Sequence, residues 1–284
     1  MIINFNGELV TKDTIFTIEN RGYKYGDALF ETIKVVNSKI LFLEDHYFRL
    51  MASMRILRIE IPMYFTMEFL SEEILKTIKS NDLAQSTVRV RLNVDRGNFG
   101  NYLPKTNTNI NYAISAVKLQ TPFYTINTSK TYVVDLFKDH FVSPSLLSTL
   151  KTNNKALQVI GCIYAKENDL DNCLVLNTNK HVIEALNGNI FLVNKDTIKT
   201  PPLSDGCLNG IMRKQILNVL KNNPNYNLEE ASISAFELQK ADELFITNTI
   251  KGILPITKYR KKRFGFNNKA QDIVSKLNAK IRLG

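Results

Sequence analysis

Leu146-Leu-Ser-Thr-Leu-Lys-Thr-Asn-Asn154 places a lysine, Lys151, in a polar turn that directly follows an apolar run. Further along the chain, Glu184 stands in apolar company between two strand-like runs. A third stretch, Gly206-Cys-Leu-Asn-Gly-Ile-Met-Arg213, is a glycine-bearing turn that opens a helix. Each stretch has an ordinary structural interpretation when it is taken alone, and the order of the three predicts a binding site.

The three stretches supply the parts that bind pyridoxal phosphate. The cofactor's aldehyde forms an imine with a lysine amine, which must be neutral to attack, and Lys151 lies in a mostly apolar context. A carboxylate beside the pyridine nitrogen keeps that nitrogen protonated, so that the ring accepts electrons from the substrate. Glu184, which follows Val182 and Ile183, is the candidate for this carboxylate.

The third stretch predicts a phosphate-binding helix start. Helix N-termini offer backbone N–H groups and the positive end of the helix dipole to an anion. We expect Asn209 to cap the helix, Gly210 to let the backbone approach the phosphate, and the amides of Ile211 and Met212 to point at it. A polar turn at 247–249 follows a strand-like run and adds hydroxyl groups.

Composition predicts a globular protein of one large domain or two modest ones. The chain has 284 residues, of which 44% are hydrophobic and 23% charged. No run reaches the length of a membrane span, and the first residues lack the regions of a signal peptide, so a cytoplasmic protein is expected. The cysteines are few and widely spaced, which fits free thiols, and the histidines form no cluster that would predict a metal site. These residues are Cys162, Cys173, Cys207, His46, His140 and His181.

The net charge of +10 suits anionic metabolites as substrates. The densest basic run is Lys258-Tyr-Arg-Lys-Lys-Arg263, which we interpret as a solvated hairpin. Nucleic-acid binding through this run is the alternative, but no known nucleic-acid-binding motif accompanies it. No nucleic-acid partner and no membrane partner are therefore expected.

Strand-like and helix-like runs alternate and predict a mixed α/β fold in two parts. Gln120–Ser129 carries a proline and no periodicity, which indicates a linker between a smaller domain, 1–119, and a larger one, 130–284. Expected strands cover 2–5, 14–18, 28–36, 40–43, 88–94, 111–117, 131–137, 173–177, 181–184, 189–194 and 243–247. An Asn-Gly turn at 6–7 separates the first two. Expected helices cover 44–58, 66–80, 153–168, 209–222, 234–240 and 268–282.

Ordered matches along nearly the whole chain resemble the fold-type IV, or class IV, pyridoxal phosphate enzymes. This family includes branched-chain aminotransferases, D-amino acid aminotransferases and aminodeoxychorismate lyases. The resemblance rests on the following residues and motifs: Arg21-Gly-Tyr-Lys-Tyr-Gly-Asp-Ala-Leu-Phe-Glu-Thr32, His46-x-x-Arg49-Leu50, Lys151-Thr152, Glu184-x4-Asn189-x-Phe191, Thr200-Pro-Pro202, Leu208-x-Gly-Ile-Met-Arg213, Ala241-Asp-Glu-Leu-Phe245 and Pro255.

The resemblance implies a smaller N-terminal α/β domain, a larger C-terminal pseudo-barrel domain and a homodimer with the site between the domains, near the partner subunit. It implies that Lys151 holds pyridoxal 5'-phosphate and moves the substrate proton, and that Glu184 faces the pyridine nitrogen. The remaining site residues that it implies are, for the cofactor, Arg49, Asn189, Gly210, Ile211, Met212 and Thr249, and for the substrate pocket, Tyr25, Phe30 and Tyr102.

The groups expected to bind the substrate carboxylate depart from the named subfamilies. Arg96-Gly97 resembles D-amino acid aminotransferases, but Asn101 and Leu103 follow where those enzymes carry arginine and histidine. Ala156 stands where branched-chain enzymes carry a tyrosine. Arg91 is the candidate for the missing contact with the substrate carboxylate, because strand alternation places it on one face with Arg89. The alternative is that Arg89 and Arg91 are both solvated strand residues.

The sequence predicts a class IV aminotransferase that transfers an amino group between an amino acid and a 2-oxo acid. An aminodeoxychorismate lyase, which releases pyruvate and leaves 4-aminobenzoate for folate synthesis, is the alternative. Lys151-x-x-Asn154-Lys155 and the Gly-Ile-Met-Arg run ending at Arg213 resemble the lyase branch more closely. The same residues serve both reactions. A family member that keeps the cofactor for regulation is a third alternative.

Overall fold

A computed structural model describes residues 1–11, 16–105, 109–127, 129–221, 223–265 and 268–283. The chain forms two compact units, Met1–Pro122 with Leu150–Asn154 and Phe123–Thr149 with Lys155–Gly284. The change at Pro122 lies within the stretch expected as a linker, 120–129. The short segment Leu150–Asn154 was expected inside the larger domain, and the structure places it in the first unit because it pairs with a strand there.

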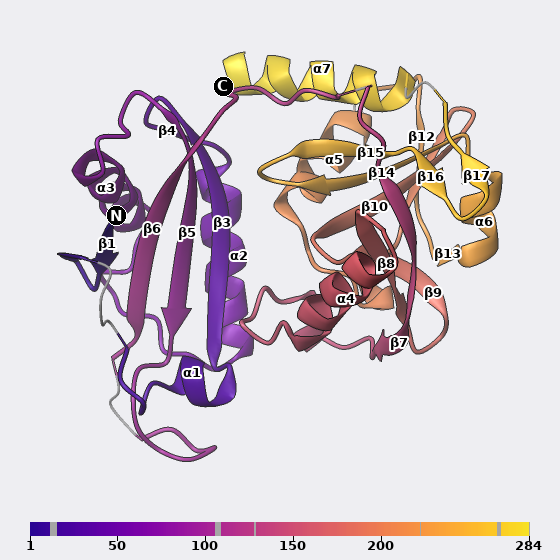
Figure 1. Ribbon diagram of the computed structural model, residues 1–284. Helices are drawn as coiled ribbons and strands as arrows, with labels where there is room; N and C mark the ends of the chain where they lie inside the picture. The colour runs from indigo at the N-terminus through magenta and orange to yellow at the C-terminus, as the bar shows by residue number, and fades with distance from the viewer. Residues whose placement is uncertain (12–15, 106–108, 128, 222, 266–267, 284) are drawn as a thin grey trace. The chain divides into compact units, whose positions relative to one another are not determined.

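The first unit is a six-stranded antiparallel sheet covered by helices (Figure 1). The order of its strands is β2-β1-β6-β5-β3-β4. The strands are β1 (Ile2–Phe5), β2 (Glu8–Thr11), β3 (Ala28–Val36), β4 (Lys39–Ile40), β5 (Thr87–Asp95) and β6 (Asn111–Leu119). The helices are α1 (Arg21–Tyr25), α2 (Leu43–Ile56) and α3 (Met67–Ser80).

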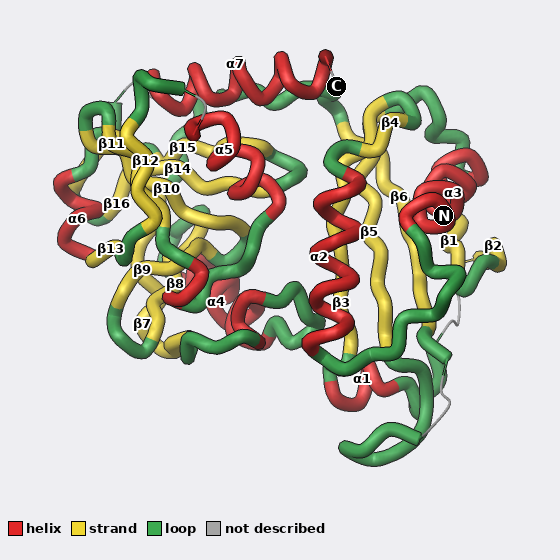
Figure 2. The backbone as a smooth tube through the Cα atoms, turned by 180° about the vertical axis from the view of Figure 1, so that it is seen from behind, coloured by secondary structure: helices red, strands yellow, loops and turns green. Residues whose placement is uncertain are grey.

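Helices α2 and α3 cover one face of this sheet, as Figure 2 shows. Side chains alternate between the two faces of a strand. On β3, the buried residues Leu29, Ile33 and Val35 join the core against the helices, while Phe30 and Lys34 point to the other face. The apolar spacing that predicted the two helices therefore corresponds to their buried sides.

The N-terminal hairpin differs from the sequence expectation. The Asn-Gly turn forms as predicted, with φ of 52° at Asn6 and 90° at Gly7, as a two-residue hairpin turn requires. The chain pairs at once, so that Phe5 lies opposite Glu8 and β2 follows directly. Of the strand expected at 14–18, residues 16–18 lie outside any strand, and 14–15 lie outside the described residues.

Helix α1 was not predicted, because it is too short to show a helical period. Its first turn is capped by Asn20, whose side chain accepts a hydrogen bond from the Tyr23 N–H at 3.0 Å. Gly26, with φ of 65°, ends it in the left-handed conformation. The helix therefore depends on one residue at each end and not on an apolar stripe.

The second unit is built on an eleven-stranded mixed sheet. Its strands are β7 (Val133–Val142), β8 (Asn172–Asn177), β9 (His181–Ala185), β10 (Gly188–Asn194), β11 (Thr197–Thr200), β12 (Asn227–Glu230), β13 (Ile233–Ser234), β14 (Glu243–Asn248), β15 (Gly252–Ile256), β16 (Lys258–Tyr259) and β17 (Lys262–Arg263). Its helices are α4 (Ala156–Glu167), α5 (Ile211–Lys221), α6 (Ala235–Lys240) and α7 (Asn268–Leu283). Short 3-10 turns cover Leu147–Thr149 and Leu203–Asp205.

The register of the central strands places three polar residues in one row. Glu184 on β9 lies opposite Asn189 on β10, and Asn189 lies opposite Thr247 on β14. Directly opposed residues of antiparallel strands share a face. Asn189 and Thr247 are buried, and Glu184 is half-buried. These three polar residues form a row across β9, β10 and β14, and this face is therefore a candidate for a binding site.

The basic run forms a hairpin, as predicted, in which β16 pairs with β17. Lys262 and Arg263 are exposed, and Arg260 forms an ion pair with Asp135 at 3.2 Å. Among the described helices, none combines the length and the apolar character that crossing a bilayer requires.

Candidate active site

A short piece of antiparallel pairing positions Lys151 within the first unit. The Phe30 N–H donates to the Lys151 carbonyl at 2.9 Å, and the Asn153 N–H donates to the Ala28 carbonyl at 2.9 Å. Leu29 and Thr152 form the bridge between the two hydrogen bonds. The polar turn that carries Lys151 is therefore held against the first residues of β3.

Phe30 gathers two cations at this point. The Lys151 Nζ atom lies 4.3 Å from the centre of the Phe30 ring, and the Arg91 guanidinium carbon lies 3.9 Å from it. Burial lowers the pKa of Arg91, and the nearby charge of Arg89 lowers it further. Two positive groups at one ring favour an anion beside them, and a carboxylate is the anion that Arg91 is suited to bind.

Tyr25 and Tyr102, both expected at the substrate pocket, lie together in the first unit. Their ring centres are 5.5 Å apart, and the Arg21 guanidinium carbon lies 5.2 Å from the centre of the Tyr25 ring. Tyr102 is 90% exposed. The predicted substrate-pocket residues therefore form two groups in the first unit. Tyr25 contacts Tyr102 in one group, and Phe30 contacts Arg91 and Lys151 in the other.

Arg49 belongs to a third group. It donates Nε–H to Glu31 Oε1 at 2.8 Å and Nη2–H to Glu31 Oε2, and its side chain is 8% exposed. The Glu31 Oε2 atom also lies 2.6 Å from His46 Nδ1. Successive strand residues point to opposite faces, so Glu31 faces α2 while Phe30 faces away from it.

In the second unit, Glu184 and Asn189 hold the turn that precedes α5. Glu184 Oε2 accepts the Leu208 N–H at 2.9 Å, and Asn189 Nδ2 donates to the Leu208 carbonyl at 2.8 Å. Both backbone groups of one residue are bound by two neighbours in the polar row. The acid and the start of the helix are therefore parts of one arrangement, as their order in the sequence predicted.

Gly210 occupies the cap position of α5. The Lys214 N–H donates to the Gly210 carbonyl at 3.0 Å, which is the first helical hydrogen bond, so Gly210 and not Asn209 takes this position. A Cβ atom at Gly210 would lie 2.0 Å from Asn189 Oδ1. A side chain here would displace the Asn189 amide, and the backbone N–H groups of Ile211 and Met212 lie in the first turn of the helix.

Thr247 and Thr249 extend the polar row beyond Asn189. The Thr247 hydroxyl is buried and is without a hydrogen-bond partner among the residues that the structure describes. Thr249 lies in the turn after β14, and its carbonyl accepts the Tyr124 hydroxyl at 2.8 Å. The Thr247 hydroxyl could bind a phosphate oxygen, because it is buried and lacks a partner among the described residues. The start of α5 at Gly210 offers backbone N–H groups to the same anion.

Two further titratable groups lie near Glu184. Burial lowers the pKa of Lys155, and the charge of Glu184 opposes this effect. Burial raises the pKa of the Cys207 thiol to about 12, so this cysteine is protonated at neutral pH. Lys155 lies four residues after Lys151 in the sequence, so a labelling experiment on the reactive amine has to distinguish these two lysines.

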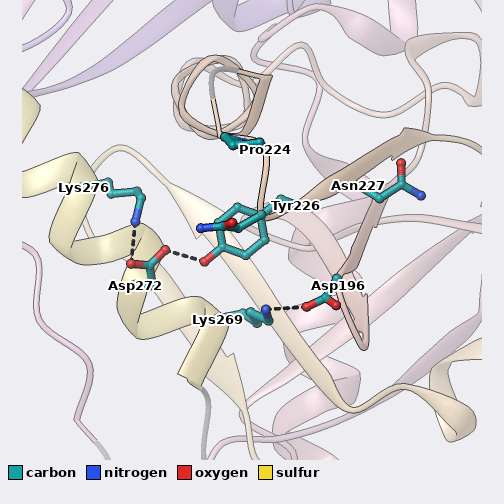
Figure 3. A pocket seen from close by; sticks show the side chains of 8 residues that line it. Asp196, Pro224, Tyr226, Asn227, Lys269, Asp272 and Lys276 are labelled. Carbon is teal, nitrogen blue, oxygen red and sulfur yellow. Dashed lines mark hydrogen bonds and ion pairs between the residues drawn. The ribbon is translucent and has the colours of Figure 1, made fainter.

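An open cavity of about 780 Å³ lies elsewhere in the second unit and does not contain the predicted residues. Its acids and bases are already paired, as Figure 3 shows: Lys269 with Asp196 at 2.7 Å, and Asp272 with Lys276 and the Tyr226 hydroxyl. Among the described residues, no group of acids, cysteines and histidines is arranged to hold a metal ion.

A family model described as Amino-transferase class IV matches residues 28–259. The chain belongs to this family. The D-alanine aminotransferase of Listeria monocytogenes serotype 1/2a (strain 10403S) is 28% identical over 265 residues, which cover 90% of this chain and 87% of the relative. The aminodeoxychorismate lyase of Vibrio harveyi is 25% identical over 246 residues, which cover 84% and 85%.

Solved structures confirm the mixed α/β fold of this class IV aminotransferase family member. The branched-chain aminotransferase of the archaeon Thermoproteus uzoniensis, solved with norvaline, matches with a TM-score of 0.86 at 24% identity. The match covers 97% of this chain and 93% of that one. The two sheets with their helices are thus the family fold that the sequence motifs predicted.

Sequence reasoning assigned no role in the candidate site to Glu31 or His46, although both lie in motifs that carry the family resemblance. A signal for Glu31 was present, because an acid interrupts the apolar alternation Leu29, Ile33, Val35 on the core face of β3. His46 lies three residues before Arg49 on a helix, which places both side chains on one side. Thr247 belongs to the polar turn at 247–249 that was predicted to add hydroxyl groups, and the structure places it within β14, opposite Asn189.

Proposed function

We propose that the protein is a pyridoxal phosphate-dependent class IV aminotransferase that transfers an amino group between an amino acid and a 2-oxo acid. The observation that carries the proposal is the arrangement at Leu208, where Glu184 and Asn189 bind the two backbone groups of one residue and set the start of α5. One structure thus offers an acid for a pyridine nitrogen and amide groups for a phosphate.

The residues of the second unit fit the cofactor's charged ends. The amides of Ile211 and Met212 and the hydroxyls of Thr247 and Thr249 would bind the phosphate, because helix starts and buried hydroxyls satisfy anionic oxygens. Glu184 would accept a hydrogen bond from the protonated pyridine nitrogen while its other oxygen keeps the Leu208 N–H. Arg49 from α2 would add a charge-assisted contact to the phosphate.

Bound pyridoxal phosphate supplies an aldehyde that condenses with amines and a pyridinium ring that accepts electrons from the substrate Cα. Lys151 would attach to the aldehyde in the resting enzyme. The Lys151 Nζ atom would also act as the base that takes the proton from the substrate Cα and holds it. Glu184 would keep the pyridine nitrogen protonated throughout.

The substrate's carboxylate would lie at Arg91, beside the Phe30 ring. Arg91 offers a planar fork of N–H donors that matches a carboxylate, and its guanidinium packs on the Phe30 ring. Tyr25 and Tyr102 would line the same substrate pocket, as in the family expectation. An α-amino acid and a 2-oxo acid both carry the carboxylate that this group recognises, so both substrates would use the same contact.

Elimination of pyruvate from aminodeoxychorismate is the second candidate function. The similarity to the Vibrio harveyi lyase over 84% of the chain favours it, and so does Ala156, which stands where branched-chain enzymes carry a tyrosine. Two measurements separate the reactions. Transamination without an acceptor leaves the cofactor in its aminated form, whereas elimination releases pyruvate and leaves the cofactor as an aldehyde.

We also propose a homodimer. Helix α4 leaves Val159, Ile160 and Ile163 at least 42% exposed on one side, at helical spacing. An apolar helix side exposed in this way favours a protein partner, and a second copy satisfies it with a symmetric interface. Sedimentation of the wild type against Ile163→Asp tests this, with a shift to monomer expected for the variant.

Borohydride reduction followed by peptide mapping tests the cofactor assignment. Reduction makes the attachment of pyridoxal phosphate permanent, and the label is expected on Lys151. Lys155 is the matched control, because burial lowers its pKa and it lies four residues away from Lys151 in the sequence. A label on Lys155, or protein that takes up no cofactor, would contradict the proposed function.

A further inference from the structure

Arg21 is a buried arginine that is bound to an exposed loop, 97–103, of the first unit. The Arg21 side chain is 4% exposed, whereas Phe99 and Tyr102 in the loop are 50% and 90% exposed. A buried guanidinium is costly unless its N–H groups are hydrogen-bonded and its charge is paired. What its N–H groups bind therefore indicates why an arginine stands at this position.

The guanidinium binds three carbonyl groups of this one loop. Its Nη1–H groups donate to the Phe99 carbonyl at 3.4 Å and to the Asn101 carbonyl, and an Nη2–H donates to the Tyr102 carbonyl at 3.1 Å. The Phe99 N–H donates in turn to the Glu19 carbonyl at 3.2 Å. A single side chain, Arg21, thus fixes most of the backbone between Phe99 and Tyr102.

The loop backbone has a conformation that it would not prefer on its own. Phe99 has a φ of 73°, and Gly97 and Gly100 have φ of 82° and 85°. The left-handed region is easy for glycine and unfavourable for a bulky residue such as phenylalanine. Backbone strain of this kind persists only where the surroundings hold it, and it is concentrated at functional sites. The hydrogen bonds of Arg21 are what holds it here.

Asp27 orients the Arg21 guanidinium. Asp27 Oδ2 accepts the Arg21 Nε–H at 2.9 Å and the Arg96 Nε–H at 2.8 Å. Arg96 also donates to the Arg58 carbonyl at 2.6 Å, just beyond α2. Burial alone raises the pKa of Asp27, but the hydrogen bonds and charges of Arg96 and Arg21 outweigh it and hold the pKa below its usual range. The carboxylate is therefore charged at neutral pH and pairs with both guanidinium groups.

The backbone on either side of Asp27 binds the turn that carries Lys151. The Gly26 carbonyl accepts Asn154 Nδ2–H at 3.3 Å, and the Ala28 carbonyl accepts a backbone N–H of the same turn at 2.9 Å. Asp27 thus connects two segments of the first unit. Its side chain acts on the loop, and its backbone neighbours act on the turn of the proposed reactive lysine.

We propose that Arg21 and Asp27 are positioning residues that set one wall of the substrate pocket. They hold the loop 97–103 so that the exposed Tyr102 ring stays against Tyr25, with 5.5 Å between the ring centres. This inference rests on the proposed function, in which both rings line the pocket. A fixed, exposed aromatic ring contacts the apolar part of a substrate without losing much freedom on binding.

Steady-state kinetics test the inference with 2-oxoglutarate as acceptor and leucine or alanine, each in its D and L form, as donor. Leucine reaches further toward a wall than alanine does, so the ratio of kcat/KM for leucine to that for alanine reports on the wall. Arg21→Lys removes the planar fork of donors, and Asp27→Asn removes the charge that orients it. Both should lower the ratio by about threefold to tenfold, the range for one aromatic contact. In the Tyr102→Ala background, the same substitutions should change the ratio by less than about twofold.

Amide hydrogen exchange of the loop is a readout that does not depend on the reaction. The Phe99 N–H is bound to a backbone carbonyl, so it exchanges only when the loop opens. In the full chain with cofactor added, Arg21→Lys and Asp27→Asn should speed exchange of the peptide that contains Phe99 by about tenfold or more.

Glu73→Gln is the matched control. Glu73 is another mostly buried carboxylate of the first unit, bound to Asn4 Nδ2 at 2.6 Å and to the Tyr112 hydroxyl at 3.2 Å. Neither of these partners belongs to the loop 97–103, so the loop exchange and the leucine-to-alanine ratio should stay at the wild-type values. If Asp27→Asn does not fold, Arg21→Lys decides the question.

A purely structural role gives a different result. Faster loop exchange with an unchanged leucine-to-alanine ratio, or an equal loss of this ratio with and without the Tyr102 ring, would overturn the inference and leave the proposed function standing. Loop exchange at the wild-type rate in both variants would overturn it as well. Wild-type protein that transfers no amino group from any of these donors would contradict the proposed function, and the inference with it.

Discussion

Replacing Gly210 by alanine is the most direct probe of the Leu208 turn. The added Cβ atom would lie 2.0 Å from Asn189 Oδ1, whereas carbon and oxygen in contact need more than about 3 Å. The Asn189 amide would have to move by about 1 Å, which removes its 2.8 Å hydrogen bond to the Leu208 carbonyl. We expect about 1 kcal/mol for the lost bond and about 1–3 kcal/mol for the crowding.

Urea denaturation of the protein without cofactor measures this cost of about 2–4 kcal/mol in the free energy of unfolding. The matched background is Asn189→Ala, in which the clashing amide is absent. There, Gly210→Ala should cost less than about 1 kcal/mol, the residual penalty for alanine at a cap position. A double-mutant cycle isolates the difference. Equal costs in both backgrounds, or a cost below about 0.5 kcal/mol in the wild type, would refute the reasoning.

Four further outcomes are expected. Lys151→Ala should fold within about 1 kcal/mol of the wild type and take up no borohydride-stable label; retained turnover would contradict its role. Glu184→Gln still accepts the Leu208 N–H and should keep the cofactor bound, but slow proton transfer in single turnovers by about tenfold or more; an unchanged rate would indicate another partner for the nitrogen. Arg91→Ala should raise the KM for the amino donor about tenfold, and Arg89→Ala on the same strand face serves as the control for a general charge effect. The pKa of Glu31 is lowered from 4.5 to about 2 in the folded protein, so its stabilisation is complete above pH 4.5 and is lost as the pH falls through 2; the wild type should lose about 3 kcal/mol more than Glu31→Gln over this range in acid titrations of unfolding.

Local signals in the sequence predicted the described α-helices other than α1. Helix α3 begins after Thr66, whose hydroxyl accepts the Phe69 N–H at 3.2 Å, and α6 begins with a capping box between Ser234 and Glu237. Such caps lie within one turn of the residues that they stabilise. Glu184 and the start of α5 each have an ordinary structural interpretation alone, and their order along the chain and the family resemblance made them candidates for the site.

Long-range pairing was not predictable from the same signals. Nothing near Lys151 in the sequence shows that its backbone pairs with Phe30, because that partner lies far away in the chain. The register that aligns Glu184, Asn189 and Thr247 also depends on three separate strands. The family resemblance indicated that Lys151 and Arg49 matter, but the contacts that orient them became visible only in the structure.

The pairing of Thr152 with Leu29 has a consequence for biosynthesis. Strand β3 is synthesised long before Leu150–Asn154, the segment that pairs with its first residues. The ribosome must add Phe123–Thr149, which belong to the second unit, before this segment can pair. A fragment ending at Pro122 would expose the Ala28 carbonyl and the Phe30 amide as an unfinished edge, open to non-native strand pairing. Truncations at the apparent boundary should therefore aggregate unless Leu150–Asn154 is supplied.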